Sequence, residues 1–322
     1  MKKTLLLALA LLVPQSWAER PAVLVESWLD NWMDHTTSIA QEFCNSWRHE
    51  LPETGMMPSF ITAEFTSNMG ERHGGSSLSW QELGINLPLA DPRRSGGKNW
   101  MFNASLNAEV TFMNPEGAFD LRRNELYQLS MPLSVLVPHK ESNMMVFAVS
   151  PSLASDFVHR AHSFHFNMLG TYRIRHSESF SYSVGLAYAP TAGDWSIMPV
   201  LTFDWQVTPE WVIYMSGYKV AAMRDMGQGL RAGVFVQTAG GSWAVDTPSG
   251  TRLLRVRSLV SGVTTEYDFS KPGQTKRIVA LSLGCTLATA ADICEFNSDR
   301  NREESHHYHP GLFVSGCVDF RF

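Results

Sequence analysis

From about residue 58 to the end of the chain, apolar and polar residues alternate with a period of two. The segment 100–112 shows this most clearly: its even positions carry Trp, Phe, Ala, Leu and Val, and its odd positions carry Met, Asn, Ser, Glu and Thr. Such alternation predicts a β-strand with one apolar face. The segment is longer than a typical globular strand of about 5–6 residues, and it slightly exceeds the roughly 9–11 residues that cross a membrane at a tilt.

The same pattern recurs along the chain, and turn-forming residues such as Asp91-Pro92 and Lys271-Pro272-Gly273 separate the runs. The predicted strands are 59–68, 78–88, 100–112, 124–137, 143–153, 162–174, 180–188, 195–207, 211–221, 229–239, 252–267, 276–288 and 312–322. Bacterial single-chain barrels have an even number of strands. We therefore expect about 12 strands, within a range of 10 to 14, and we expect one of the thirteen segments to be split, merged or absent.

The chemistry of the two strand faces favours a membrane barrel over a soluble sandwich. Trp and Tyr recur near strand ends, as the aromatic girdles of a membrane barrel require. The polar faces carry charges such as Glu109, Arg173, Asp204 and Asp319. Each of these would need a buried partner in a soluble core, whereas a barrel lumen keeps them wet or ion-paired. The sequence thus predicts an all-β, antiparallel transmembrane β-barrel over residues 56–322.

The last predicted strand places apolar residues, including Phe320 and Phe322, on one face, and Asp319 and Arg321 on the other. An alternating strand that closes on an aromatic residue resembles the terminal signal of bacterial outer-membrane proteins. We therefore interpret Phe320 and Phe322 as a lipid-facing assembly signal. This interpretation implies barrel-assembly machinery and outer-membrane lipid as partners.

The N-terminal region has a different pattern. Residues 1–18 combine two lysines, a short apolar run and small residues at a cleavage site, which predicts a cleaved signal peptide and export to the bacterial outer membrane. No later run reaches the roughly 18 apolar residues of a membrane helix. Residues 19–55 carry Trp28, Trp32, Ile39 and Phe43 at helical spacing. We predict a helical segment there, which either packs at the barrel rim or plugs the lumen.

Composition narrows the possible functions further. The formal net charge of −5 gives no basic excess for binding nucleic acid. An exported protein can oxidise its cysteines, so we predict that any disulfide joins two of Cys285, Cys294 and Cys317. The alternation points Cys285 outward and Cys317 inward, and a bond between these two would need a β-bulge that re-phases one strand.

The stretch from Gly185 to Tyr218 contains Leu186-Ala187-Tyr188, Pro199, Trp205, Pro209 and Trp211. This stretch resembles a family of outer-membrane β-barrels of unknown function. The resemblance covers about a third of the chain. It implies the fold and the location, and it brings no activity and no catalytic residues.

The histidines do not indicate an enzyme. His306, His307 and His309 lie in a polar stretch, 297–309, that we predict to be an exposed loop rather than a metal site. Ser163 and His165 share a strand face but lack a third, orienting group. Nucleotide-binding and hydrolase motifs are missing from the sequence. We therefore expect no catalytic residues, no metal and no cofactor.

Arg231, Arg255 and Arg257 are the candidate basic residues of the lumen. They would form either an anion-selective constriction or a ladder of salt bridges that fills the barrel. Two function classes follow: a passive pore for small solutes, or a closed-lumen barrel with a structural or surface-interaction role. An outer-membrane lipid hydrolase is a distant third. The pattern leaves the solute and the oligomeric state open.

Overall fold

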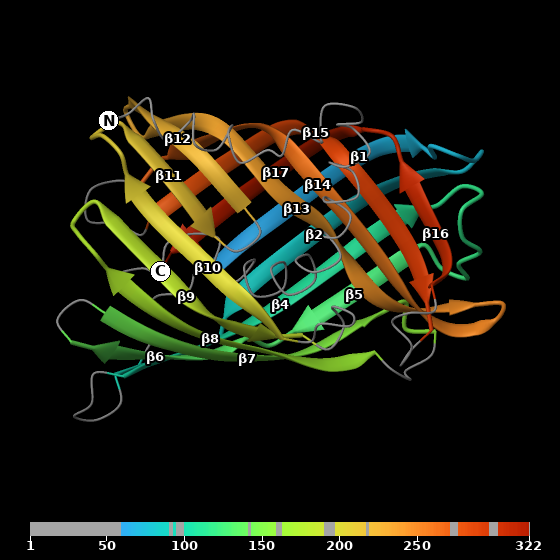
Figure 1. Cartoon of the computed structure of the whole chain (residues 1–322), viewed down its shortest axis with the longest axis horizontal. Coiled ribbons are helices and arrows are strands. Elements are labelled where there is room, and N and C mark those ends of the chain that lie inside the picture. The colour runs from blue at the N-terminus through green and yellow to red at the C-terminus, as the bar shows by residue number, and fades with distance from the viewer. Residues whose placement is uncertain are drawn as a thin grey trace, which may run out of the picture.

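A computed structural model describes residues 59–89, 93–94, 100–140, 143–158, 163–189, 197–216, 219–270, 276–295 and 302–321. Within these residues the chain forms one antiparallel sheet that closes on itself as a barrel (Figure 1). The predicted signal peptide and the predicted helical segment 19–55 lie outside the described residues. In the part of the chain that the structure describes, no helix is long and apolar enough to span a membrane.

The strands fall close to the predicted ones. They are β1 (Ser59–Gly70), β2 (Ser77–Pro88), β3 (Arg93–Arg94), β4 (Met101–Asn114), β5 (Glu125–Ser130), β6 (Leu133–His139), β7 (Asn143–Ser155), β8 (Phe164–Arg175), β9 (Phe180–Tyr188), β10 (Ile197–Gln206), β11 (Trp211–Ser216), β12 (Lys219–Gly227), β13 (Leu230–Thr247), β14 (Gly250–Asp268), β15 (Lys276–Cys294), β16 (Arg302–Tyr308) and β17 (Leu312–Arg321).

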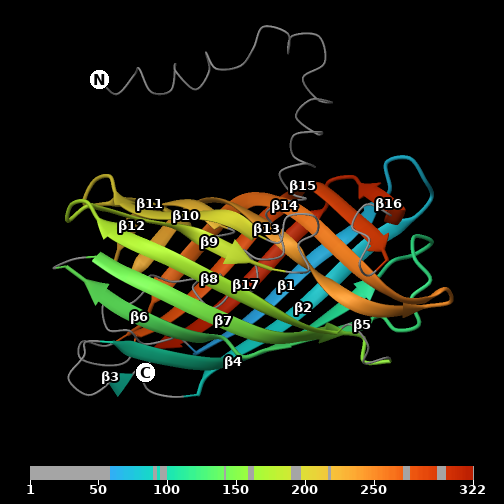
Figure 2. The same ribbon diagram turned by 60° about the horizontal axis from the view of Figure 1, so that its bottom comes forward.

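The strands follow one another around the ring in chain order, and β1 pairs with β17 to close it (Figure 2). At three positions of the ring, two of the seventeen strands lie end to end and together form one strand of the barrel. Both β2 and β3 pair with β4, both β5 and β6 lie between β4 and β7, and both β16 and β17 pair with β15. Counting each of these pairs once leaves fourteen strands among the described residues, the upper end of the predicted range.

Two sequence predictions of this region were wrong in detail. The predicted strand 211–221 contains two strands, because the chain reverses between Ser216 and Lys219, which lie opposite each other in the β11–β12 pair. The phase of the alternation inverts there, and the sequence prediction missed the turn signal Ser216-Gly217. The predicted exposed loop 297–309 contains β16, which is polar in sequence but pairs with β15 through its backbone.

The outer face of the barrel wall is apolar and the inner face is polar, which is the reverse of the arrangement in a soluble protein. On β1, Ile61 is 54% exposed on the outer face, while Thr62 and Glu64 are buried on the inner face. Exposed outward side chains include Phe65, Leu83, Ile85, Phe102, Phe147, Phe166, Val184, Leu186, Leu201, Val234, Val263, Leu281, Leu283 and Val314. An apolar belt around a polar interior is the arrangement that a lipid bilayer stabilises.

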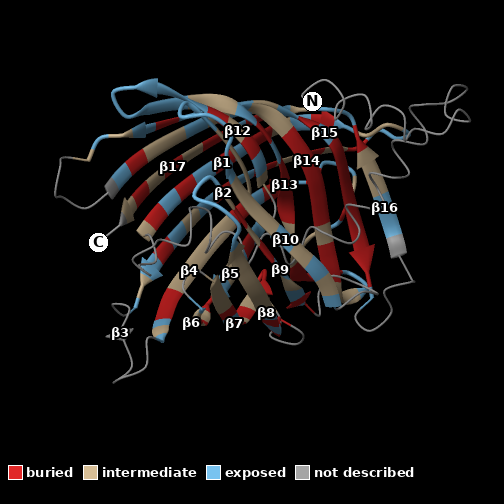
Figure 3. Ribbon diagram, turned by 60° about the vertical axis from the view of Figure 1, so that its left-hand side comes forward, coloured by how far each residue is buried: buried red, intermediate tan, exposed pale blue. Residues whose placement is uncertain are grey.

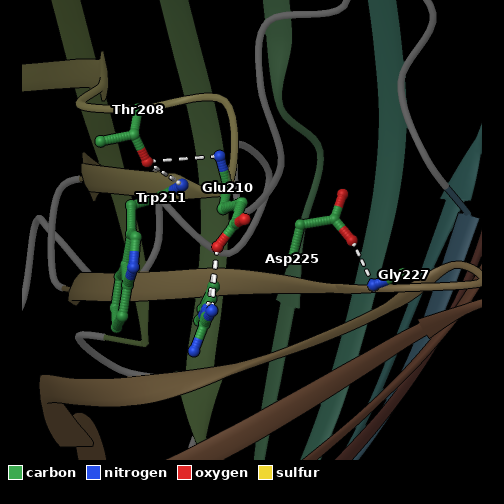
Figure 4. A network of polar contacts seen from close by, with 6 residues as sticks. Thr208, Glu210, Trp211, Asp225 and Gly227 are labelled. Atoms are coloured by element: carbon green, nitrogen blue, oxygen red, sulfur yellow. Dashed lines mark hydrogen bonds and ion pairs between the residues drawn. The ribbon is translucent and has the colours of Figure 1, made fainter.

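Short turns connect several strands at the end of the barrel where Ser59 and Arg321 lie, which we call the termini end. Figure 4 shows two of them. The Thr208 hydroxyl accepts hydrogen bonds from the backbone N–H groups of Glu210 and Trp211, at 3.3 and 3.1 Å. Glu210 also binds Arg224 on the neighbouring strand at 2.9 Å. Short turns on the termini side are typical of the periplasmic end of outer-membrane barrels.

Candidate functional site

The candidate site is the barrel lumen together with its distal mouth, the opening opposite the termini end. Part of the inner wall, on β1, β4, β6 and β8, carries hydroxyl and amide side chains, and another part carries an apolar cluster that includes Phe235 and Phe313. Several polar atoms of the hydroxyl and amide side chains are buried and have no hydrogen-bond partner among the described residues; they belong to Thr66, Ser105, Thr111, Ser134 and Asn167. Buried polar groups in native proteins are nearly always satisfied by protein or by water. Such a wall is therefore suited to facing water or a polar solute.

Carboxylates gather on one part of this wall. The β1–β2 register sets Glu64 directly opposite Glu82, and both side chains are buried on the inner face. Glu109 of β4 follows on the next strand, opposite Gly84. The Ser315 hydroxyl donates to Glu64 at 3.2 Å. The register thus places three carboxyl groups on adjacent strands of the inner wall.

At the distal mouth, four strands continue beyond the barrel wall as a separate sheet. We call this sheet the leaf; it consists of residues 238–247 of β13, 250–259 of β14, 288–294 of β15, and β16. The last pair between β12 and β13 is Lys219 with Gln237, so the leaf begins where β13 loses its β12 neighbour. Because its strands remain paired with one another, the leaf is one unit.

The strands that enter the leaf bend at nearly the same level. Gly240 in β13 has φ +107°, a conformation that only glycine adopts readily. The register between β14 and β15 shifts between Leu259 and Val260, as in a β-bulge. The strand position that β16 and β17 share is also interrupted, at residues 309–311 between the two strands. Three interruptions in adjacent strands allow the sheet to turn away from the wall.

The far edge of the leaf reaches the opposite wall of the barrel. Ala244 of β13 pairs with Ser155 of β7 in a parallel bridge, although the ring does not make these two strands neighbours. Figures 1 and 2 both show the β13–β14 hairpin running past β5, with its tip projecting beyond the strands at that end of the barrel. The Asp246 N–H donates to the Asp156 carboxylate at 2.8 Å, and Arg122 lies 3.1 Å from the Asp246 carboxylate. We call this set of contacts the β7 clasp.

A second set of contacts, the His306 clasp, holds the leaf to the loop between β1 and β2. His306 Nδ1 lies 2.8 Å from Glu71 Oε1, and the Ser76 hydroxyl donates to Glu71 Oε2. A β-carbon on Gly74 would collide with the Glu71 carboxylate, so a larger residue there would require the Glu71 side chain to move. The hydrogen bond from Ser76, followed by that from His306, lowers the pKa of Glu71 below its usual value. The clasp therefore favours the ionised carboxylate.

Between the leaf and the wall lies the largest apolar cluster of the described residues. Trp243 and Leu254 contribute from the leaf, and Trp80 and Met113 contribute from the lumen side of β2 and β4. Figure 3 shows buried residues running along β14 and β15 into this region. The leaf thus packs on the wall through a hydrophobic core as well as through the two clasps.

The family model described as "Domain of unknown function (DUF6268)" matches residues 59–314, from β1 into β17. The chain belongs to the DUF6268 family. The resemblance drawn from the Gly185–Tyr218 stretch, to a family of unknown function, is therefore confirmed. A search of curated proteins finds no match.

Solved structures similar to this DUF6268 chain include three with low identity. The P. putida toluene transporter TodX is 9% identical, with a TM-score of 0.34 and coverage of 89% of this chain and 93% of TodX. Pseudomonas aeruginosa OpdQ is 7% identical, with a TM-score of 0.31 and coverage of 82% and 98%. Acinetobacter baumannii OccAB4 is 8% identical, with a TM-score of 0.29 and coverage of 82% and 97%. We draw no function from these likenesses.

The structure does not bring the three predicted lumen arginines together. Arg231 lies opposite Glu266 near the termini end of β13, far along the hairpin from Arg255, which lies opposite Ser242 in the leaf. Arg257 is buried in an ion pair with Asp292. A single arginine constriction is therefore wrong for this DUF6268 barrel. The alternation predicts that Arg255 and Arg257 lie on the same face of their strand. It could not show that the β13–β14 hairpin leaves the barrel wall at a point between Arg231 and these two arginines.

The other predicted site residues have mixed outcomes. Cys285 is exposed, Cys294 and Cys317 are buried, and the described residues contain no disulfide among the three. In the β15–β17 register, Cys285 lies opposite Leu312, and Cys317 lies opposite Ala280. The predicted disulfide between Cys285 and Cys317 stays a prediction. Phe320 and buried Asp319 lie on opposite faces of β17, as expected. Phe322 lies outside the described residues, and its role in assembly stays a prediction.

Sequence reasoning missed the leaf and both of its clasps. Glu71, Asp156 and Asp246 lie in or beside turns, where the alternation carries no information. Two signals were present: Gly240-Gly241 inside a strand pattern, which indicates a bend, and His309-Pro310-Gly311 before the last strand, which indicates an interruption. Neither signal shows where a bent sheet goes, since that depends on contacts across the ring.

Proposed function

We propose that this barrel is a passive pore for small polar solutes in the bacterial outer membrane. We also propose that a signal peptide, later cleaved, directs the export of the protein to that membrane. The single observation that carries the proposal is the inner wall of buried hydroxyl and amide groups with unmatched hydrogen-bonding capacity, which includes Thr66, Ser105 and Asn167. A structural barrel gains nothing from such groups, because each costs about 1–3 kcal/mol when buried without a partner. A solute path needs them, since they replace the water that a polar solute loses.

The strand number and the wall charge refine the proposal. Eight-stranded barrels are filled by their side chains, and barrels of 16–18 strands leave an aqueous channel. Fourteen strands lie nearer the wider class. The inner carboxylates Glu64, Glu82 and Glu109 favour cations over anions along this wall, because rings of acidic side chains attract cations. Ser163 and His165 share the inner face, and Ser152 lies opposite His165. We assign no catalytic role to them, because a serine and a histidine also need a third group that orients the histidine.

The alternative, a closed-lumen structural or surface-interaction barrel, also has a specific observation in its favour. The wall is shielded from solvent in this structure, with Ser150 and Asn167 at 0% exposure, and the leaf packs on it through an apolar cluster. A barrel that never opens would stay in this form. The two functions therefore differ in whether the lumen ever admits solutes.

Planar-bilayer recording of the purified full-length protein separates the two functions. The pore account predicts discrete conductance steps, with a reversal potential in a salt gradient that indicates cation preference. A membrane that stays silent with folded, heat-modifiable protein supports the closed barrel. Cell fractionation and sequencing of the mature N-terminus test the location, with Glu19 expected as the first residue.

A further inference from the structure

We propose that the leaf is a lid, which closes the distal mouth in this structure and swings away from the β7 wall when the pore conducts. The inference rests on the proposed function and concerns its regulation. It starts from the position of the leaf: residues 238–247 of β13 leave the β12 edge and meet β7 on the far side of the ring. A sheet that crosses a mouth in this way obstructs it.

The construction of the lid indicates where it would bend. Gly240, the register shift at Leu259, and the 309–311 interruption lie across neighbouring strands at almost one level. Backbone hydrogen bonding is already broken or distorted at such points, so a bend there costs less than one elsewhere in the sheet. Beyond the bend, β13 to β16 stay paired and can move as a body.

The hydrogen-bonded part of the attachment to β7 is small, and it adds to the apolar cluster between the leaf and the wall. The strand contact is one parallel bridge, Ala244 with Ser155, supplemented by the hydrogen bond from Asp156 N–H to Ala244 O at 3.1 Å. The Asp156 carboxylate accepts the Asp246 N–H at 2.8 Å and the Val158 N–H at 3.0 Å. A full strand pair between the leaf and β7 would hold it permanently. A single bridge with the carboxylates of Asp156 and Asp246 is weaker than a full strand pair, so most of the free energy that opposes opening comes from the apolar cluster between the leaf and the wall.

The β1–β2 side is the more extensive attachment. The Arg72 N–H donates to His307 O at 2.8 Å, the His309 N–H donates to Gly70 O at 2.9 Å, and Glu71 binds His306. These contacts lie beside the bend, where a hinge is expected to stay attached. The β7 clasp lies at the far edge of the leaf, where the displacement on opening is largest. We therefore assign the β7 clasp as the release point.

A disulfide across the release point tests the lid. The bridge sets Ala244 and Ser155 opposite each other, and neighbouring strands lie about 4.7–4.9 Å apart, within the Cα range of about 4.4–6.8 Å for a disulfide. The double variant Ser155→Cys with Ala244→Cys is recorded in a bilayer before and after reduction. The matched control pair is Ala232→Cys with Thr265→Cys, which face each other within the β13–β14 wall. The unaltered protein, with its native cysteines, is recorded under both conditions.

The lid predicts that oxidation lowers the open probability of the Ser155–Ala244 pair by at least about tenfold, equivalent to 1.4 kcal/mol of closing free energy, and that reduction restores it. The control pair and the unaltered protein should not respond. Equal conductance of the locked and reduced pair would overturn the lid and leave the pore intact. Silence of every variant under both conditions would overturn the pore, and the lid with it.

A second variant keeps the test decisive if the cysteine pair fails to fold. Asp156→Ala removes the carboxylate of the β7 clasp and should raise the open probability at least severalfold. Its control is Asp225→Ala, which removes a carboxylate that accepts the Gly227 N–H in an exposed turn at the termini end (Figure 4). An unchanged open probability in folded Asp156→Ala, with conduction otherwise normal, would contradict release at β7.

Discussion

Trp243→Ala is the substitution that most directly weakens the packing of the leaf on the barrel wall. Trp243 is 1% exposed and belongs to the same apolar cluster as Trp80, Met113 and Leu126 of the wall. A buried aromatic side chain covers about 150–250 Å², and each Å² contributes about 25 cal/mol. Full burial is thus worth about 4–6 kcal/mol.

Only part of this energy opposes opening of the lid. One side of the Trp243 ring lies against Gly241 of its own strand, a contact that moves with the leaf. Assigning about half of the burial to the wall gives about 2–3 kcal/mol. Because every 1.4 kcal/mol is a factor of ten, Trp243→Ala should shift the closed-to-open ratio roughly 30- to 150-fold toward open.

The assay combines single-channel open probability with trypsin cleavage at Arg252 and Arg255, which lie in β14 of the leaf. Both quantities should rise in Trp243→Ala. The matched control is Trp205→Ala, since Trp205 is 43% exposed on the outer face and does not contact the leaf cluster. If Trp243→Ala folds with the heat-modifiability of the unaltered protein and neither quantity changes, the leaf does not close the barrel through this core.

Three further predictions concern charge and assembly. Because the pKa of Glu71 is lowered in the folded protein, its contribution to stability is present above its ordinary pKa and is lost as the pH falls through the lowered one; the unfolding temperature followed by circular dichroism should therefore fall in acid, and Glu71→Gln should already show a lowered unfolding temperature at neutral pH. Glu82→Gln should reduce cation preference in a salt gradient, whereas Glu210→Gln at an exposed turn should not; an unchanged reversal potential in Glu82→Gln would exclude this carboxylate from the path. Phe322→Ala should lower the amount of folded protein in the membrane fraction more than Arg321→Ala, and the opposite ranking would reverse the two faces that we assign to the last strand.

The sequence was sufficient for the barrel because the alternation of a membrane strand is a local property. Each strand must show lipid one apolar face and the lumen one polar face, so Ile61 and Thr62, or Phe320 and Asp319, can be assigned from neighbouring positions alone. The merging of β11 with β12 shows the limit of this reasoning. Opposite residues such as Met215 and Val220 share a face, so the phase of the alternation inverts between the two strands, and a run of mostly apolar residues hides that inversion.

The lid could not be predicted because its contacts join segments far apart in the sequence. Asp156 and Asp246 meet only after the ring has closed and the hairpin has bent across it. The same holds for Glu71 and His306. The separation of the predicted arginines has the same cause: Arg231 and Arg255 belong to one hairpin, but the wall ends between them.

Osmotic swelling of proteoliposomes with uncharged polar solutes of increasing size tests the central claim most directly. It requires neither charge selectivity nor a resolved single-channel current. The account predicts swelling with the smallest solutes, a sharp size limit, and faster swelling with Asp156→Ala than with the unaltered protein. Liposomes that contain correctly folded unaltered protein and folded Asp156→Ala, and that swell no faster than empty ones, would contradict the pore.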